Sequence, residues 1–466
     1  MKIALIRPPA TYADWYERPV LGLAYLASCI ELNAFECGVF DAYFHSWSEQ
    51  ELLRQVNTFE PDVVGLTAMT HEIIQAAHIA VQLKNRRNIP VIVGGCHTTA
   101  LPERTLEEFP VFDYGVYGEG EKTVVELLRS LEEGTPSGLG AIRGLVFRDG
   151  ERIICNEPRP FLTSPELDAL PYPGFHHYYG RSPKALSGNN ASYTIASSRG
   201  CPYRCAFCMQ VLGRQIRRRS AESVCQEIEY AVATYGAHMF DFVDEIFLFD
   251  CRETREVLEL MIARDLPNRI TWNGQTRANF VNPDLIALAK RAGCTGLAMG
   301  VESGDDGILK VIEKGITVEQ VRRAVRIIKE AKIPLSTYFI LGHPNETKET
   351  LLRTVRLSRE LNTDTVAVGT MVPYPGTRVF DMARRGEGRY RLIAQDWSDY
   401  DKYGARSLEL DGLPYRDLQR WQRRAVLEFY LRNFRLVDFL KYSWKRKRAA
   451  LFLLKRSLAR LSRKRT

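Results

Sequence analysis

Three closely spaced cysteines form the group with the clearest metal-binding pattern in this chain. Cys201, Cys205 and Cys208 have the spacing Cys-x3-Cys-x2-Cys and follow an apolar segment that predicts a strand. Soft thiolates favour iron–sulfur clusters, and a four-iron cluster takes four ligands when it is fully held by protein. Three cysteines therefore predict a cluster with one iron open to another molecule. A zinc site is the alternative, but the nearest later cysteine, Cys225, has no partner at ligand spacing.

Polar side chains follow the predicted strands of the same region. Strand–helix alternation from residue 192 to about 375 predicts roughly six units of a barrel-like parallel sheet. Asp244 and Glu245 follow its second strand, Arg277 its third, and Glu302 and Ser303 its fourth. Barrel-like folds place chemistry at strand carboxyl ends, so these residues are candidates for one site. The predicted strands are residues 193–197, 239–243, 271–275, 296–301, 335–341 and 365–372.

The first 131 residues show a second strand–helix alternation, which predicts a doubly wound parallel sheet. Its predicted strands are residues 2–6, 36–41, 63–67, 91–94 and 114–117, with helices over 21–32 and 70–86. Ligands of such sheets bind at the carboxyl ends of the strands, where glycines let the backbone approach a large ligand. The candidate residues there are Thr67, Met69, Gly94, Gly95, His97, Thr98, Thr99, Gly118, Glu119 and Gly120.

The cysteine motif, with an aromatic residue before its last cysteine, resembles the radical S-adenosylmethionine (SAM) superfamily. Residues 18–27, 94–103 and 118–121 resemble the cobalamin-binding domain that precedes the radical SAM barrel in one large subfamily. The resemblance implies an α/β protein. Its expected parts are a doubly wound, Rossmann-like cobalamin-binding domain (1–135), a connector with a β-hairpin (136–190), a partial (β/α)6 radical SAM barrel (191–395) and a helical C-terminal region with a basic tail (396–466).

The resemblance also implies roles for the candidate residues. Cys201, Cys205 and Cys208 would hold a [4Fe–4S] cluster whose fourth iron chelates the amino and carboxylate groups of SAM. Either Glu245 or Asp244 would bind the SAM ammonium group. Arg277 would bind the SAM carboxylate through its guanidinium. Glu302, which precedes Ser303, would accept hydrogen bonds from the ribose hydroxyls. Thr98 and Thr99 would hydrogen-bond the nucleotide tail of cobalamin.

One departure from the related cobalamin domains concerns cobalt. Many of those domains carry Asp-x-His-x-x-Gly, whose histidine ligates cobalt from below. The loop over residues 7–21 contains no histidine, and His45, His71, His78 and His97 do not fit that spacing. We therefore expect cobalt bound here to lack a protein imidazole ligand.

The net charge of +8 comes from the end of the chain. Residues 441–466 hold eleven Lys and Arg and no acid, which leaves about −3 for the other 440 residues. No apolar run approaches the roughly 18 residues of a membrane-spanning helix, and the N-terminus does not resemble a signal peptide. We expect a cytoplasmic protein without a nucleic-acid partner.

Apolar residues recur at helical spacing within this basic tail. A basic amphipathic helix is typical of a peripheral element at the inner membrane surface. A helix packed on the barrel with a solvated basic face is the alternative, and an acidic partner or nucleic acid is a weaker third. The apolar positions are Trp444, Leu451, Leu454, Leu458 and Leu461.

The resemblance implies a cobalamin-dependent radical SAM enzyme that methylates an unactivated carbon of a small biosynthetic intermediate, by way of a 5′-deoxyadenosyl radical and methylcobalamin. Such an enzyme needs an external low-potential electron donor of the flavodoxin or ferredoxin type. A cyclase or oxidase without methyl transfer needs the same cofactor sites. A methylthiotransferase is disfavoured because Cys29, Cys37 and Cys96 lie on separate elements, and a cobalamin sensor would not need the acids and arginine in barrel order. The substrate is not specified; a lipid or another hydrophobic molecule would suit a membrane-bound tail.

Overall fold

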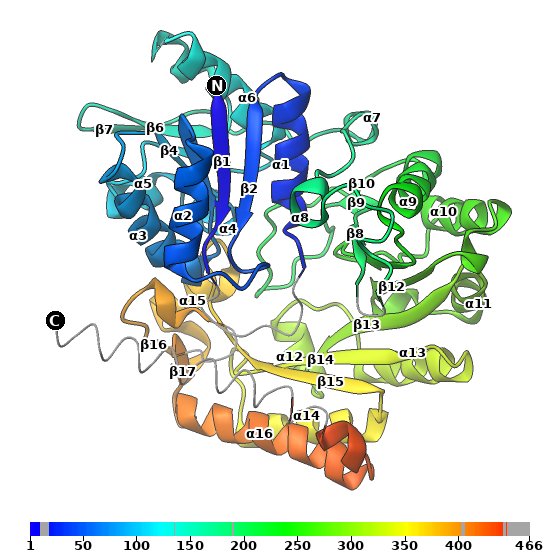
Figure 1. Cartoon of the computed structure of the whole chain (residues 1–466). Coiled ribbons are helices and arrows are strands. Elements are labelled where there is room, and N and C mark those ends of the chain that lie inside the picture. Colours follow the sequence, from blue (N-terminus) through cyan, green and yellow to red (C-terminus); the bar gives the residue numbers. More distant parts are fainter. Residues whose placement is uncertain (10–17, 135, 189–190, 402–405, 441–443, 445–466) are drawn as a thin grey trace.

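The computed structural model describes residues 1–9, 18–134, 136–188, 191–401, 406–440 and 444 of the 466-residue chain (Figure 1). Two larger sheets, each flanked by helices, form most of the described molecule. Two small two-stranded sheets, β9 (Ser198–Arg199) with β10 (Arg217–Arg218) and β16 (Tyr390–Leu392) with β17 (Leu408–Leu410), are both antiparallel. Among the described residues, no helix is long and apolar enough to cross a membrane.

The first sheet has the strand order β2-β1-β3-β4-β5-β6-β7. Its first five strands pair in parallel, whereas β6 pairs antiparallel with β5 and then with β7. The hairpin expected in the connector therefore extends this sheet at the edge that β5 would otherwise leave open. The strands are β1 (Lys2–Arg7), β2 (Glu36–Asp41), β3 (Val63–Thr67), β4 (Val91–Gly94), β5 (Tyr114–Val116), β6 (Leu145–Asp149) and β7 (Arg152–Cys155).

Helices cover both faces of this sheet because strand side chains alternate between faces. Ile3 and Leu5 of β1 join a core with α1 and α6, whereas Ala4 and Ile6 join one with α2 and α3. This arrangement is the predicted doubly wound sheet. The helices are α1 (Leu21–Leu32), α2 (Glu49–Phe59), α3 (Ile73–Lys84), α4 (Cys96–Ala100), α5 (Pro102–Glu108) and α6 (Glu121–Glu132).

The second sheet has six parallel strands in the order β15-β14-β13-β12-β11-β8. The strands at its two ends do not pair with each other, so the described strands form an open, partial barrel. The strands are β8 (Tyr193–Ile195), β11 (Met239–Phe242), β12 (Thr271–Thr276), β13 (Cys294–Glu302), β14 (Leu335–Leu341) and β15 (Thr365–Thr370). The helices that follow or flank them are α9 (Ala221–Tyr235), α10 (Arg252–Ala263), α11 (Pro283–Arg291), α12 (Asp306–Val311), α13 (Val318–Glu330), α14 (Lys348–Leu361), α15 (Arg378–Arg385) and α16 (Tyr415–Arg432).

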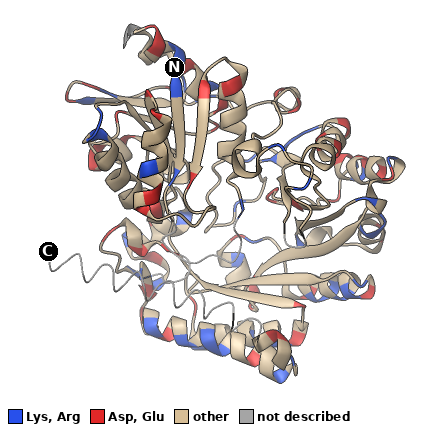
Figure 2. Ribbon diagram, in the orientation of Figure 1, with Lys and Arg blue, Asp and Glu red and all other residues tan. Residues whose placement is uncertain are grey.

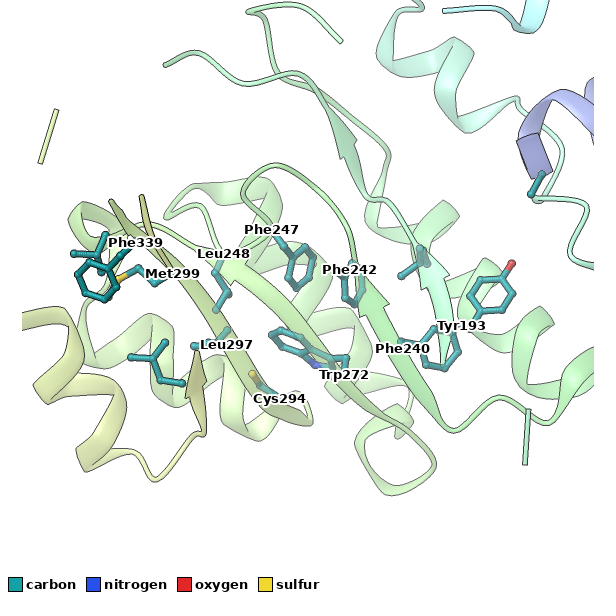
Figure 3. Packing of buried hydrophobic residues seen from close by; sticks show 14 of the residues in the cluster. Tyr193, Phe240, Phe242, Phe247, Leu248, Trp272, Cys294, Leu297, Met299 and Phe339 are labelled. Carbon is teal, nitrogen blue, oxygen red and sulfur yellow. The ribbon is translucent and has the colours of Figure 1, made fainter. Parts of the chain in front are cut away.

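Aromatic side chains fill the core of the second sheet (Figure 3). The rings of Phe242 and Phe247 stack 3.8 Å apart, and Trp272 meets Phe247 edge-on at 5.1 Å. The Trp272 ring is fully buried, and its indole N–H donates to the carbonyl of Ala292 at 2.8 Å. The core therefore packs against β11 and β12, whose carboxyl ends carry candidate site residues.

A row of aromatic contacts joins the two sheets. Phe44, which follows β2, meets Tyr178 of α8 (His176–Tyr179) edge-on at 5.2 Å. Phe175 lies 6.2 Å from Tyr178 and 4.8 Å from Tyr193 of β8. One continuous buried core consequently includes residues of both sheets.

The observed strands agree closely with those expected from the sequence. The predicted strands over 36–41, 63–67, 91–94 and 335–341 match in full, and the others differ by one or two residues at an end. The expected helix over 70–86 begins with a 3-10 turn over Thr70–Glu72 before α3. The basic tail lies outside the described residues except for Trp444, and the domain boundaries given above stay predictions.

Candidate active site

An open cavity lies between the carboxyl edges of the two sheets. It has about 1190 Å³ of space free of protein atoms, including its mouth, and its walls are mostly apolar. One wall comes from α1 and from the ends of β3, β4 and β5, with Thr67, Gly94, Gly95, Gly118 and Gly120 among its residues. The opposite wall comes from the barrel side, and its residues are Ala196, Ser198, Arg199, Leu212, Val243 and Glu245.

Two glycines in the cavity wall have backbone conformations that other residues rarely adopt. Gly95 has φ +100°, and a Cβ there would lie 2.8 Å from both the Ala68 carbonyl and the Thr67 Oγ1. Gly118 has φ +77°, and a Cβ there would meet no atom within 4 Å. Both loops thus expose bare backbone to the cavity, an arrangement that lets a large flat ligand approach closely.

The structure does not place Met69 or His97 among the cavity-lining residues. The Met69 side chain is 44% exposed, and its backbone N–H donates to Glu72. His97 is buried and meets the Trp397 ring edge-on at 5.0 Å. Burial lowers the pKa of His97 to about 4, so its imidazole is neutral at neutral pH.

The neighbouring threonines do not line the cavity either. Thr98 is fully buried, and its Oγ1 has no hydrogen-bond partner within the described part of the chain. The Thr99 Oγ1 accepts the backbone N–H of Gly118 at 3.1 Å. Thr99 therefore shapes the glycine loop that faces the cavity. No histidine is among the described residues that line the cavity. That cobalt bound here lacks a protein imidazole ligand stays a prediction.

Glu119 faces two arginines of the barrel side. Arg199 donates to its carboxylate at 3.0 Å and Arg217 at 2.8 Å, and Arg199 also pairs with Glu121 at 2.7 Å. All four side chains are at most 12% exposed. We call Glu119, Glu121, Arg199 and Arg217 the interdomain ion cluster. It joins the glycine loop after β5 to the β9–β10 pair, two residues before Cys201.

Backbone contacts fix the cysteine loop. Gly200, directly before Cys201, has φ +92°, and a Cβ there would lie 2.3 Å from the Gln215 carbonyl oxygen. The Cys201 N–H donates to the Gly213 carbonyl at 3.1 Å, and the Cys208 N–H donates to the Cys205 carbonyl at 3.0 Å. These contacts fix the path of the backbone on both sides of Cys201.

The three cysteines share one loop over residues 201–208, and soft thiolates favour an iron–sulfur cluster. Cys208 is exposed, but nearby protein atoms keep most of the water away from its thiol. This desolvation, together with the neighbouring thiols of Cys205 and Cys201, raises the pKa of Cys208 to about 12. Binding of iron would supply the positive charge that makes the thiolates favourable.

The two candidate acids after β11 differ in surroundings. The Asp244 carboxylate is occupied by hydrogen bonds within the protein. It accepts the Ser197 N–H at 3.1 Å, the Ser197 hydroxyl at 2.7 Å and the Ser198 hydroxyl at 2.6 Å. Glu245 lines the cavity. Burial raises the pKa of Glu245, and Asp244 adds to this rise. Of the two acids, Glu245 is the one with a carboxylate facing open space beside the cysteine loop.

Arg277 lies against the cysteine loop. Its guanidinium stacks on the Tyr203 ring at 3.6 Å, and its Nη1 is 4.0 Å from the Cys205 sulfur. Its Nε donates to Asn279 at 2.8 Å, whereas the buried Nη2 has no hydrogen-bond partner in the described part of the structure. A buried cationic donor without a partner fits a site for a ligand carboxylate.

Glu302 ends β13 in a conformation that costs energy. It has φ +69°, and its carboxylate accepts from Lys314 at 2.6 Å. The side chain turns back over Gly300, where a Cβ would lie 2.3 Å from the Glu302 Oε1. Backbone strain of this kind clusters at functional sites. Ser303 is buried and accepts the Asp305 N–H at 3.2 Å, so its hydroxyl supports the loop before α12.

The loop after β14 is organised by a buried carboxyl group. One oxygen of Glu346 accepts the backbone N–H groups of Gly342 and His343, the latter at 3.1 Å. The other oxygen has no partner among the described residues. The His343 ring lies 3.4 Å from the Glu302 carbonyl, so this loop supports the end of β13.

On the barrel side of the cavity, sequence reasoning predicted Glu245 but missed Arg199 and the neighbouring Arg217 and Lys314. Arg199, Arg217 and Lys314 have their partners 80, 98 and 12 residues away. The position of Arg199 two residues before Cys201 is the one local signal that pointed to it. Residues 18–27 resemble part of the cobalamin-binding domain, but the resemblance assigns no role to the apolar side chains of α1 that line the cavity.

Profiles of two protein families match the chain. The radical SAM superfamily matches residues 195–358, and the B12 binding domain matches residues 16–128. An uncharacterized methyltransferase of Pyrococcus horikoshii is 31% identical over 441 residues, which are 93% of each chain. The anaerobic magnesium-protoporphyrin IX monomethyl ester cyclase of Cereibacter sphaeroides is 30% identical over 82% of this chain and 62% of its own.

The fold is similar to that of solved structures. The radical S-adenosylmethionine methyltransferase TsrM from Kitasatospora setae, with cobalamin and a [4Fe–4S] cluster bound, superimposes with a TM-score of 0.71. The match covers 92% of this chain and 88% of that one, at 20% identity. The cobalamin-dependent radical enzyme OxsB, with aqua-cobalamin and SAM bound, gives a TM-score of 0.61 over 78% of this chain and 52% of its own, at 19% identity.

Proposed function

We propose that this chain, which belongs to the cobalamin-binding radical SAM enzymes, methylates an unactivated carbon of a small biosynthetic molecule. Its cofactors are a [4Fe–4S] cluster, SAM and cobalamin. One observation carries the proposal: a single cavity has glycine-rich loops on one wall and, on the other, Arg199 and Glu245 beside the cysteine loop. Two cofactors bound to these two walls would lie next to each other.

The residues of the site fit these cofactors. Cys201, Cys205 and Cys208 would hold the cluster, and Glu245 would hold the SAM ammonium group. The unpartnered Nη2 of Arg277 would take the SAM carboxylate, and the carboxylate of Glu302 would accept from the ribose. When bound, the cluster with SAM supplies radical hydrogen abstraction, and cobalamin supplies the methyl group. The mostly apolar cavity wall would disfavour water beside the reacting atoms.

The reaction is tested by its stoichiometry. With cluster- and cobalamin-loaded enzyme, a chemical reductant and a substrate that turns over, we expect two SAM consumed per methyl added. One should appear as S-adenosylhomocysteine and the other as 5′-deoxyadenosine. SAM with a trideuterated methyl group should transfer the label to the product, and absence of label in the product would refute methyl transfer.

A radical cyclase or oxidase is the second candidate. The 30% identity to the magnesium-protoporphyrin IX monomethyl ester cyclase over 82% of this chain favours it. The same assay separates the two functions, because a cyclase or oxidase would form 5′-deoxyadenosine from SAM without a methylated product.

The partners of the enzyme follow from its chemistry and surface. Reductive cleavage of SAM needs an external low-potential donor of the flavodoxin or ferredoxin type. We also propose a hydrophobic substrate reached at a membrane surface. Apolar side chains at 57–91% exposure support membrane contact, because they directly precede or begin the basic tail. These residues are Phe434, Leu436, Val437, Leu440 and Trp444. The preceding helix α16 is itself basic, with five arginines and two acidic residues (Figure 2).

A further inference from the structure

A carboxylate and two adjacent histidines converge on the outer side of α1. The Oε1 of Glu31 lies 3.2 Å from the Nε2 of His176 and 2.9 Å from the Nε2 of His177. All three ligand atoms lie within 4.8 Å of one another. Glu31 belongs to α1 and both histidines belong to α8, so the group joins two elements that are distant in sequence.

The convergence of His176 and His177 is unusual for neighbours on a helix. Adjacent helical residues normally point in different directions. Here the two rings tilt together, with centroids 4.2 Å apart, and both direct the same nitrogen at one carboxylate oxygen. Zinc bonds of about 2.0–2.1 Å in tetrahedral geometry place ligand atoms roughly 3.3 Å apart. The two observed nitrogen–oxygen distances are close to this value, and the two histidine nitrogens lie within 4.8 Å of each other.

The three side chains are only partly buried. The side chains of Glu31, His176 and His177 are 34%, 22% and 13% exposed, which leaves one side open to a water ligand.

We propose that Glu31, His176 and His177 bind a divalent transition metal, with zinc as the best match, separate from the iron–sulfur cluster. Imidazole nitrogen and carboxylate oxygen are zinc ligands, and three protein ligands with one water complete a tetrahedron. The metal would tie α1 to the segment around α8. Hydrogen bonds from Ser28 to the Tyr172 carbonyl and from Gly174 to the Ala24 carbonyl already join these elements. The same helix lines the cofactor cavity on its other side, with Leu21 and Tyr25.

Metal analysis of the cluster-loaded protein tests the proposal. After incubation with zinc and desalting, we expect one equivalent of zinc beyond the cluster iron and a melting temperature several degrees above that of EDTA-treated protein. Cobalt(II) should give visible bands of a tetrahedral site without the near-ultraviolet band of a thiolate ligand. A thiolate band would assign the metal to cysteines and overturn the site.

Glutamine variants separate metal binding from simple hydrogen bonding. H176Q and H177Q keep an N–H donor toward Glu31 but remove the imidazole ligand. We expect at least a tenfold loss of zinc affinity, with melting in EDTA close to that of the unaltered protein. H78Q is the matched control, because His78 pairs with Glu49 at 3.1 Å without a second histidine. Equal zinc binding by H177Q, or no zinc in the unaltered protein, would show that these residues only hydrogen-bond.

Discussion

At the scale of single residues, we expect the cysteines of the 201–208 loop to bind iron and the cysteines elsewhere in the chain not to. C201A, C205A or C208A should abolish the brown absorbance of anaerobically reconstituted protein and all 5′-deoxyadenosine formation, since each removes one of three iron ligands. C225A and C294A are controls, because both side chains are buried in the core. They should keep iron and SAM cleavage, and full iron content in the triple cysteine variant would contradict the assignment.

Glu245 predicts a pH dependence of SAM binding. Burial raises the pKa of its carboxyl group above its ordinary value of 4.5. The ionised form binds an ammonium group, so SAM affinity should fall as the pH drops toward this raised pKa, earlier than for an exposed glutamate. E245Q should bind SAM at least about tenfold more weakly at pH 8, in line with a lost charge-assisted hydrogen bond, and should lack the acidic decline. Equilibrium dialysis of cluster-loaded protein measures both, and an unchanged pH profile in E245Q would remove Glu245 from the site.

At the scale of elements, the interdomain ion cluster holds the glycine loop after β5 against β9–β10. Removing one partner of a buried ion pair typically costs about 3–5 kcal/mol, because a buried charge is left without compensation. R217Q should therefore lower the free energy of unfolding by an amount of that order, and weaken cobalamin retention. R252Q is the control, since the Arg252–Glu256 pair is exposed and such pairs contribute about 0–1 kcal/mol. Equal urea midpoints for the two variants would deny the ion cluster a stabilising role.

The loop after β14 predicts a pH dependence of stability. Burial raises the pKa of Glu346 to about 8 from an ordinary 4.5, despite the opposing hydrogen bonds from Gly342 and His343. Between these values the folded protein binds a proton that the unfolded chain releases, so stability falls as the pH rises from about 5 to 8. The slope from one such group is up to about 1.4 kcal/mol per pH unit. E346Q keeps an acceptor for both N–H groups and should flatten this slope in urea titrations across the range; an unaltered slope would mean that the group is ionised when folded.

At the scale of the whole molecule, the apolar residues after α16 and the basic tail predict reversible membrane binding. Each Lys or Arg near anionic lipid contributes about 1 kcal/mol, so four or five engaged charges give roughly millimolar affinity, and buried apolar residues add to it. The full chain should sediment with phosphatidylserine vesicles at low salt. Deleting residues 441–466 should abolish sedimentation without loss of SAM cleavage, and F434S should weaken it. A full chain that ignores such vesicles would refute membrane contact.

The sequence predicts the strands well because runs of β-branched residues are local signals, and the three cysteines are read from spacing alone. The sequence does not predict which way a side chain points or which residues far apart in the chain form contacts. His97 and Thr98 lie in the five-residue α4, whose buried side faces away from the cavity, and so short a helix gives no periodicity. Asp244 and Glu245 are adjacent, and only the fold shows that two serines occupy Asp244. The hairpin expected as a connector joined the first sheet because β5 presents an open edge.

The aromatic row from Phe44 to Tyr193 joins the two halves of the chain into one cooperative folding unit. One of the two buried cores contains residues of both halves, so neither half has a complete interior of its own. Cutting between residues 180 and 192 would leave Phe175 and Tyr178 exposed on one fragment and Tyr193 on the other. Heat should therefore melt the protein in one cooperative transition, and the halves should be recovered in folded form only when they are made together.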